Sequence, residues 1–307
     1  MASTAPKMQS ADWGIIGLLS LLWGGAFYFI EIGLRGFPPN TLVFLRMTLA
    51  IPPMLIALKI AGNHLPTDRK SWTQLFVLGV INAALPFILF FWGQTKIESG
   101  LASVLNATTP LWGVITAHFL TRDEKATPAR ICGVLLGMAG IIVMVGSEAL
   151  GGMSGSVLGQ IACLLATLCY AFAAVYARSL SQSTMTPLVV ATGQVITAAI
   201  IMLPVMLIVD QPWQLSTPGL DAWAGALGLA IPSTAIAYIF YFRLIDRAGA
   251  SNAMLVAFIM PVVAIILGVF ALGESLQPRQ IAGTALIICG LLAIDGRVFR
   301  ALNLGRG

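Results

Sequence analysis

The chain has 307 residues, of which 58% are hydrophobic and 9% are charged, and its mean hydropathy is +0.91. Soluble domains carry about 25% charged residues, so this composition excludes a soluble globular protein and indicates a chain whose surface faces lipid. The net charge of +5 does not indicate a nucleic-acid partner, because the basic residues are spread along the chain and form no single patch.

The cysteines and histidines exclude two further classes of protein. No cluster of Cys and His has the spacing of metal ligands, and a disulfide framework needs cysteines in aqueous loops. We therefore expect no metal and no cofactor, with the cysteines serving as small apolar residues. All four lie inside apolar runs: Cys132, Cys163, Cys169 and Cys289.

The first element is a polar tail, residues 1–12, which leads into an apolar run without a small-residue cleavage site. We therefore expect a retained first helix and not a signal peptide. Ten apolar runs follow, each long enough to cross a bilayer as a helix, and Gly, Pro, Asn, Asp and Ser mark the joints between them. The predicted spans are residues 13–34, 40–60, 71–93, 99–120, 129–147, 156–178, 187–209, 221–244, 250–271 and 278–296.

The basic residues predict the orientation of these spans. With the N-terminus in the cytoplasm, three lie outside (Arg35, Lys96 and Arg279) and one, Arg46, lies within a span. The remaining thirteen lie inside, as the positive-inside rule favours, so both termini are expected in the cytoplasm. The thirteen are Lys7, Lys59, Arg69, Lys70, Arg122, Lys125, Arg130, Arg178, Arg243, Arg247, Arg297, Arg300 and Arg306.

The chain also repeats itself. At a shift of 151 residues Trp72 pairs with Trp223 and Pro110 with Pro261. Each half has five predicted spans, an odd number, so the second half would enter the membrane upside down. Inverted repeats are the architecture of many secondary transporters, although some channels have them too. The predicted units are a first repeat, 13–147, a second inverted repeat, 156–297, and cytoplasmic tails, 1–12 and 298–307.

Motifs in both halves occur in the order and spacing of a known module. The second half contains Ala248-Gly-Ala-Ser-Asn-Ala-Met-Leu, Met260-Pro261-Val-Val, Leu272-Gly273-Glu274-Ser275-Leu276, Gln280-Ile-Ala-Gly283 and Gly290. A weaker copy in the first half contains Gly100-Leu-Ala-Ser-Val, Thr109-Pro110, Asp123-Glu124-Lys125, Gly133 and Gly140. Over nearly the whole chain, these motifs resemble the EamA module of the drug/metabolite transporter superfamily.

This resemblance implies an all-α integral membrane protein of ten transmembrane helices in a five-plus-five inverted bundle. It also implies a central cavity lined mainly by spans 1, 3, 4, 6, 8 and 9. Many bacterial members of the superfamily export amino acids and related metabolites, and the motifs are compatible with the branch of YddG-like amino-acid exporters. The motifs themselves describe helix packing and loop geometry, and they do not name a substrate.

Arg46 lies about six residues into the second predicted span, roughly 9 Å deep at a rise of about 1.5 Å per residue. A charge inside a span is costly and is expected to have a function or a partner. Arg46 could bind a substrate carboxylate or close an outer gate. Alternatively, its stem could snorkel to the interface, or it could pair with Glu31. At a shift of 148 its repeat counterpart is Gln194, so the charge is not part of the repeated scaffold, which favours a specific role.

Asn82 and Ser233 occupy matching positions near the middle of the third and eighth predicted spans, and both are candidate substrate contacts. Pro86 follows Asn82 and Pro232 precedes Ser233. Proline bends a helix and frees a carbonyl, which beside a cavity can hold a polar substrate. The two prolines are therefore candidate hinges, and a packing kink with a locally satisfied amide is the alternative.

Pro110 and Pro261 match by symmetry in the fourth and ninth predicted spans. Kinks at symmetric positions would suit rocking of one half on the other, so both are candidate hinges, and fixed bends are the alternative. Asn106 and Phe258, about one helical turn before them, are candidate substrate contacts.

Aromatic residues are frequent at the depth expected for the membrane midplane. A buried Tyr hydroxyl or Trp N–H needs a partner, which a cavity would supply, and an aromatic cavity would suit aromatic or bulky apolar substrates. Packing against lipid or a neighbouring helix is the alternative for each ring. The candidates are Trp23, Phe27, Phe87, Tyr170 and Tyr238.

No acidic residue falls at the midplane of a predicted span, and no Walker phosphate-binding motif is present. We therefore expect transport down a substrate gradient, or exchange, without a proton or ATP. The absence of HExxH, GxSxG and paired midplane aspartates argues against an enzyme. Too few polar positions are present for a continuous channel lining.

The sequence thus predicts an exporter or facilitator of amino acids, with aromatic and apolar ones favoured, and of related small metabolites. It would act by alternating access in a bacterial inner membrane. The alternatives are a small-solute channel and an exporter of drugs or other metabolites. The expected partners are a small-molecule substrate and the bilayer, with no nucleic acid, and the protein is expected to be a monomer or a weak homodimer.

Overall fold

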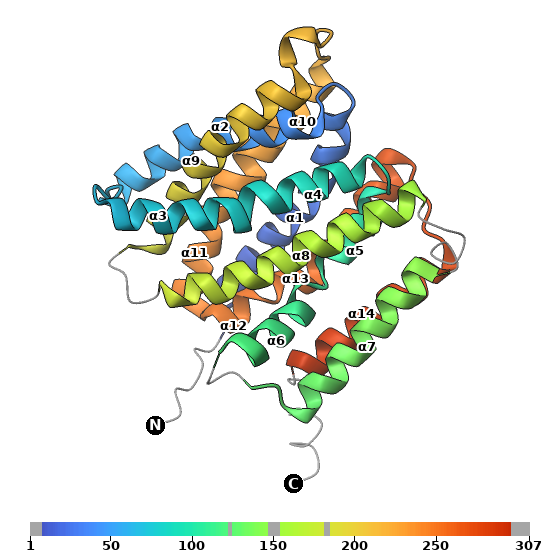
Figure 1. The fold of residues 1–307 in the computed structure, drawn as a ribbon. Helices are drawn as coiled ribbons and strands as arrows, with labels where there is room; N and C mark the ends of the chain where they lie inside the picture. The colour runs from blue at the N-terminus through green and yellow to red at the C-terminus, as the bar shows by residue number, and fades with distance from the viewer. Residues whose placement is uncertain (1–7, 122–124, 147–153, 181–184, 296–307) are drawn as a thin grey trace, which may run out of the picture.

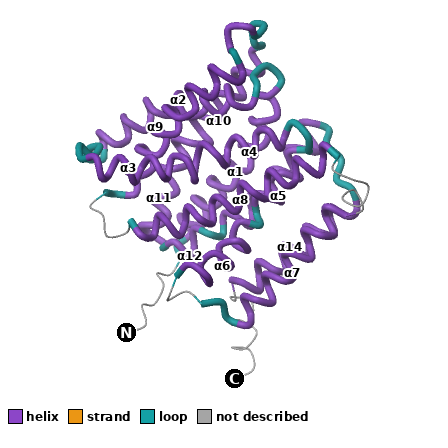
Figure 2. Tube along the Cα trace, in the orientation of Figure 1, coloured by secondary structure: helices purple, strands orange, loops and turns teal. Residues whose placement is uncertain are grey.

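The computed structural model describes residues 8–121, 125–146, 154–180 and 185–295, and the regular structure in these ranges is helical throughout (Figures 1 and 2). The predicted tail 298–307 and the motif residue Glu124 lie outside the described residues. Within the described residues, eight segments are long and apolar enough to cross a membrane. They are built from α1 (Ser10–Leu34), α2 (Pro39–Ile60), α3 (Arg69–Leu78) with η1 (Gly79–Ala84) and α4 (Leu85–Gln94), α7 (Pro128–Val145), α8 (Gly155–Ser179), α9 (Pro187–Val205) with η3 (Met206–Asp210), α10 (Leu220–Ala230) with η5 (Ile231–Ile236) and α11 (Ala237–Ala248), and α14 (Pro278–Asp295).

The predicted spans at 99–120 and 250–271 are not continuous helices, so that part of the prediction is wrong. The first is divided into two helices, and the second into three pieces, of which the last two form an apolar segment shorter than the eight above. A 3₁₀ turn, η4 (Pro212–Gln214), lies in the loop before α10. The pieces of the two divided spans are α5 (Ser99–Asn106), α6 (Thr109–Leu120), α12 (Ala250–Ala253), α13 (Val256–Leu267) and η6 (Gly268–Leu272).

Proline accounts for only one of the two breaks. The ring of Pro110 disfavours a helical residue before it and removes a backbone donor, so α5 ends and α6 begins here. The hydroxyl of Thr109 donates to the carbonyl of Asn106 at 2.7 Å and satisfies the acceptor that the missing N–H of Pro110 leaves free. Pro261, in contrast, lies inside α13, and the break in that segment comes earlier, at residues 254–255. The two symmetry-related prolines therefore do not produce matching breaks.

Two six-residue π-helical turns, η1 and η5, contain Asn82 and Ser233. Pro86 lies in the first turn of α4, directly after η1, and Pro232 lies in the first turn of η5. A proline ring clashes with the carbonyl one turn earlier, and a wider π turn is one way for the helix to accommodate it. Such turns are frequent at functional sites.

The pair α7 and α14 packs in direct backbone contact, as glycine spacing in membrane helices favours. A Cβ added to Gly133 would lie 2.5 Å from the carbonyl oxygen of Gly290, and one added to Gly140 would lie 2.7 Å from that of Gly283. Any larger residue would push the two helices apart. The pair lies beside the other helices in Figure 1.

In the rest of the bundle, helices from the two halves of the chain alternate. α1 packs against α13 and α10, and α8 packs against α6 and α4. α2 contacts η5, and α9 contacts η1. These contacts thus come in counterpart pairs from the two halves, and the two six-residue π-helical turns come to lie inside the bundle.

Candidate functional site

A cavity of about 390 Å³ lies inside the bundle, and we call it the central cavity. Helices from both halves of the chain form its wall. The structure brings together most of the residues predicted to contact a substrate. Phe258 is the exception, because it packs against the hydrophobic core without lining the cavity. The predicted residues that line the central cavity are Trp23, Phe27, Arg46, Asn82, Phe87, Asn106, Tyr170, Ser233 and Tyr238.

Arg46 is buried, with 6% of its surface exposed. Its Nε donates to the hydroxyl of Thr234 at 3.0 Å, and its guanidinium carbon lies 4.0 Å from the ring centroid of Phe87, a cation–π contact. Among the described residues no carboxylate lies within ion-pair distance of it. Snorkelling to the interface and pairing with Glu31 are therefore wrong, and the charge belongs to the central cavity.

A chain of hydrogen bonds connects η1, α9 and α11 along the cavity wall. Asn82 Nδ2 donates to Gln194 Oε1 at 3.0 Å, and Gln194 Nε2 donates to the Tyr238 hydroxyl at 3.1 Å. Ser233 differs, because its hydroxyl is buried and has no hydrogen-bond partner among the described residues. Asn82 and Tyr238 are thus held in place, and the hydroxyl of Ser233 retains its hydrogen-bonding capacity.

Thr234 connects Arg46 to the backbone of η5 and α10. Its hydroxyl donates to the Leu229 carbonyl at 2.8 Å and accepts from Arg46 Nε at 3.0 Å. In this turn the structure therefore presents a cation and a serine hydroxyl, and the idea that a proline-freed carbonyl holds the substrate stays a prediction.

Aromatic rings form a continuous part of the cavity wall. Their edge-to-face and stacked contacts are of the kind that fix ring orientation. Such a wall is rigid and apolar, and it suits a flat or bulky apolar ligand. The ring pairs, with centroid distances, are Trp23–Tyr241 (5.1 Å), Phe27–Phe90 (6.0 Å), Phe90–Tyr170 (6.1 Å) and Phe87–Tyr170 (6.4 Å).

The predicted hinge prolines are dispersed. Pro110 lines the central cavity, whereas Pro86 and Pro232 lie next to and within the π-helical turns, and Pro261 is buried within α13. Their role as hinges stays a prediction.

Sequence reasoning misses two residues that position the site, Thr234 and Gln194. The only sequence signal for Gln194 is its repeat match to Arg46, and Thr234 has no signal except that it follows Ser233. The sequence also does not predict that Met260 lines the central cavity. The sulfur of Met260 lies 3.8 Å from Asn106 Nδ2.

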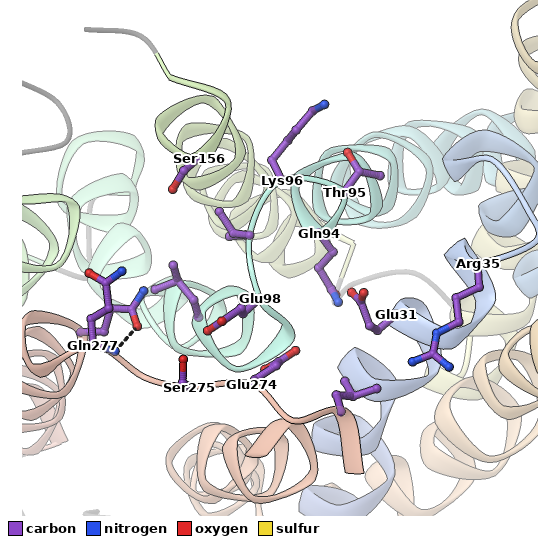
Figure 3. Close-up of a pocket in the computed structure, with 14 residues that line it drawn as sticks. Glu31, Arg35, Gln94, Thr95, Lys96, Glu98, Ser156, Glu274, Ser275 and Gln277 are labelled. Atoms are coloured by element: carbon purple, nitrogen blue, oxygen red, sulfur yellow. Dashed lines mark hydrogen bonds between the residues drawn. The ribbon is translucent and has the colours of Figure 1, made fainter. Parts of the chain in front are cut away.

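A second cavity, of about 450 Å³, lies at one end of the bundle, and we call it the end cavity (Figure 3). Figure 3 shows Glu31, Glu98 and Glu274 around the same space. The carboxylate of Glu274 accepts from the backbone N–H groups of Ser99 at 2.7 Å and Gly100 at 3.0 Å. It therefore caps the N-terminus of α5, where negative charge is stabilising.

Two further features define the end cavity. Burial raises the pKa of the Glu98 carboxyl, a backbone hydrogen bond at Ser275 opposes this, and the charge of Glu274 adds to the increase. Gln94, which lines the end cavity, is buried and donates to the carbonyl of Phe27, which lines the central cavity, at 3.0 Å. The two cavities thus approach each other at this contact between α4 and α1.

Comparison with known proteins finds relatives that align with most of the chain. Residues 12–146 and 157–294 each match the EamA-like transporter family. An Escherichia coli (strain K12) protein named as the uncharacterized inner membrane transporter YedA is 25% identical over 284 residues, which cover 92% of this chain and 90% of that protein. A probable terminal-alkyne amino-acid exporter of Streptantibioticus cattleyicolor is 25% identical over 293 residues, 95% of each chain. One protein crystal structure aligns with a TM-score of 0.66 at 20% identity, covers 94% of this chain and 98% of its own, and shows the fold alone.

Proposed function

Because the chain belongs to the EamA-like transporter family and is a multi-pass membrane protein, we propose that it exports amino acids and related small metabolites across a bacterial inner membrane by alternating access. Aromatic and apolar amino acids are the favoured cargo. The relative named as a probable amino-acid exporter supports the cargo class, and the relative named as an inner membrane transporter supports the location.

The proposed architecture is ten membrane crossings in two inverted halves, 13–147 and 156–297, with both termini in the cytoplasm. The broken segments α5–α6 and α12–η6 would supply the fourth and ninth crossings. Non-helical backbone is tolerated at membrane depth where it lines a cavity, and Pro110 and Met254, at the two breaks, both line the central cavity. The reciprocal contacts of α1 with α13 and of α8 with α6 support the inverted relation.

The observation that supports the proposed cargo is a buried Arg46 that has no carboxylate partner among the described residues and lies in a cavity walled by aromatic rings. A guanidinium binds a carboxylate through paired N–H donors. The rings of Phe87, Phe90 and Tyr170 would bury the side chain of an aromatic or apolar amino acid. The volume of about 390 Å³ lies within the range of small-ligand sites, about 300–1,000 Å³.

We further propose that the driving force is the substrate gradient or exchange of substrates. Proton-coupled carriers place an ionisable carboxylate deep in the membrane. Among the described residues that line the central cavity, none is Asp or Glu. Three carboxylates, Glu31, Glu98 and Glu274, line the end cavity instead, which in this topology faces the periplasm.

Proteoliposomes that contain the purified full chain test the proposal. We expect saturable counterflow of labelled aromatic and branched apolar amino acids without an imposed pH gradient. Arg46→Met and Asn82→Ala should slow it. Lys59→Met is the matched control, because it removes an exposed cation from the same helix as Arg46.

Three outcomes would contradict the proposal. Flux that does not saturate would indicate a channel, and strict dependence on a pH gradient would indicate proton coupling. Equal flux in the wild type and in both cavity variants would place the substrate elsewhere.

A further inference from the structure

The electrostatics of the central cavity are one-sided. Arg46 is the only charged side chain among the described residues that line it. A guanidinium carries five N–H donors, and only Nε has a partner among the described residues, the hydroxyl of Thr234. Phe87 covers one face of the group at 4.0 Å. The terminal N–H donors therefore remain available to a ligand.

An anion is the ligand that such a group requires. An unpaired charge in an apolar site is unfavourable until an opposite charge joins it. A carboxylate fits best, because its two oxygens match neighbouring guanidinium donors. Aromatic rings exclude water from the site and strengthen the pairing.

An ammonium group has no matching partner in this cavity. The amides and hydroxyls of Asn82, Asn106 and Ser233 are uncharged. An ammonium would lose its hydration without gaining an opposite charge, and it would approach the like charge of Arg46.

The carboxylates that could bind an ammonium lie in the end cavity instead. Glu31, Glu98 and Glu274 line that cavity (Figure 3), and none of them lines the central one. The contact of Gln94 with Phe27 lies between the two spaces. A ligand held by Arg46 is therefore recognised through its carboxylate and its apolar side chain.

We propose that the central cavity recognises its substrate as a monoanion, an aromatic or apolar monocarboxylate whose α-ammonium group is dispensable. This rests on the proposed function, because it names the substrate class of the same cavity. Deaminated and 2-oxo acids belong to this class together with amino acids of the same side chain. The carboxylate, and not the zwitterion, is the recognised unit.

Binding of three probes that share a 2-phenylethyl unit tests the proposal. These are 3-phenylpropanoate (carboxylate alone), phenylalanine (both groups) and 2-phenylethylamine (ammonium alone), titrated calorimetrically into the full chain in lipid nanodiscs. We expect the propanoate to bind no more weakly than phenylalanine and the amine to bind at least tenfold more weakly. Tighter binding of phenylalanine by threefold or more, comparable binding of the amine, or no binding of the propanoate at millimolar concentration would overturn the proposal.

Substitutions place the binding at Arg46. Arg46→Met should raise the dissociation constant for the propanoate at least tenfold, with Lys59→Met unchanged. Arg46→Lys keeps one charge but not the planar pair of donors, so it should bind with intermediate affinity, and it tests the proposal if Arg46→Met does not fold. Wild-type affinity in Arg46→Lys and Arg46→Met alike would overturn the assignment.

Failure of this inference is distinguishable from failure of the proposed function. If amino acids flow through proteoliposomes but the propanoate neither binds nor competes, the function holds and the monoanion proposal is wrong. If the propanoate binds through Arg46 but no compound flows, the site holds and the transport proposal is wrong.

Discussion

The central cavity and the end cavity have similar volumes, about 390 and 450 Å³, but opposite chemistry. The central cavity has one buried cation, no carboxylate in its described lining and a wall of aromatic rings. The end cavity has three carboxylates, two exposed cations, Arg35 and Lys96, and several amides. Size therefore does not distinguish the two. Charge does, and it makes the central cavity a place to bind an anion and the end cavity a polar site of mixed charge.

The largest effect should come from removing the charge of the central cavity. A charge-assisted hydrogen bond is worth about 1.5–3 kcal/mol, so Arg46→Met should lower kcat/KM for counterflow about 10- to 100-fold. Glu31→Gln, which removes a charge from the end cavity, should change kcat/KM less than about threefold, because we propose that the substrate binds in the central cavity and Glu31 does not line it. Equal losses in the two variants would mean that both cavities bind the substrate.

The second test gives the central cavity a carboxylate, the group that characterises the end cavity. Asn106→Asp adds a carboxylate to the central cavity with almost no change in shape. The ratio of the affinity for phenylalanine to that for 3-phenylpropanoate should rise about tenfold, which corresponds to about 1.4 kcal/mol. Calorimetry measures the ratio, and Asn106→Leu controls for loss of the amide. A ratio that stays at the wild-type value would show that charge does not set the preference.

A smaller effect is expected in the end cavity, where a substitution should lower stability and leave binding in the central cavity unchanged. Glu274→Gln weakens the cap on α5, and a loss of about 1 kcal/mol would lower Tm by roughly 2–4 °C. Affinity in the central cavity should not change. Fluorescence-monitored thermal unfolding checks the first point, with Ser275→Ala as an exposed control in the same loop. A large loss of affinity together with an unchanged Tm would contradict this prediction.

The smallest effect concerns pH and belongs to the end cavity alone. The pKa of Glu98 is raised from its ordinary value of 4.5, mainly by burial. A carboxyl with a raised folded-state pKa stabilises the fold below its unfolded-state pKa, and that contribution is lost as pH rises through the folded-state value. When the pH is lowered from 7 to about 5, the Tm of the wild type should therefore rise by roughly 1 °C relative to that of Glu98→Gln. The effect is small because partial exposure screens the charge. Identical pH profiles of Tm would contradict this assignment.

Much of the fold follows from local patterns. Hydropathy and turn residues predict the helices, because backbone groups in lipid must be bonded within their own segment. The glycines of α7 and α14 predict close packing, because only glycine lets two backbones approach so closely. The depth of Asn82, Ser233, Tyr170 and Trp23 along their spans follows from counting residues, and each of them lines the central cavity.

Other features do not follow from position along the chain. Phe258 has a suitable depth, but it faces the core, because the rotation of α13 is set by its packing against α1. The break before α13 has no proline to mark it. Arg46 donates a hydrogen bond to Thr234, 188 positions away in the sequence, and Asn82 donates one to Gln194, 112 positions away.

The sequence by itself determined that this is a helical membrane protein with a repeated plan and one cation deep in an apolar chain, since these depend on hydropathy and spacing. Only the tertiary structure decided that this cation has no carboxylate partner among the described residues and that three carboxylates line a separate cavity. The reason is physical: which charges meet depends on how helices distant in sequence rotate and pack, and no local pattern records that.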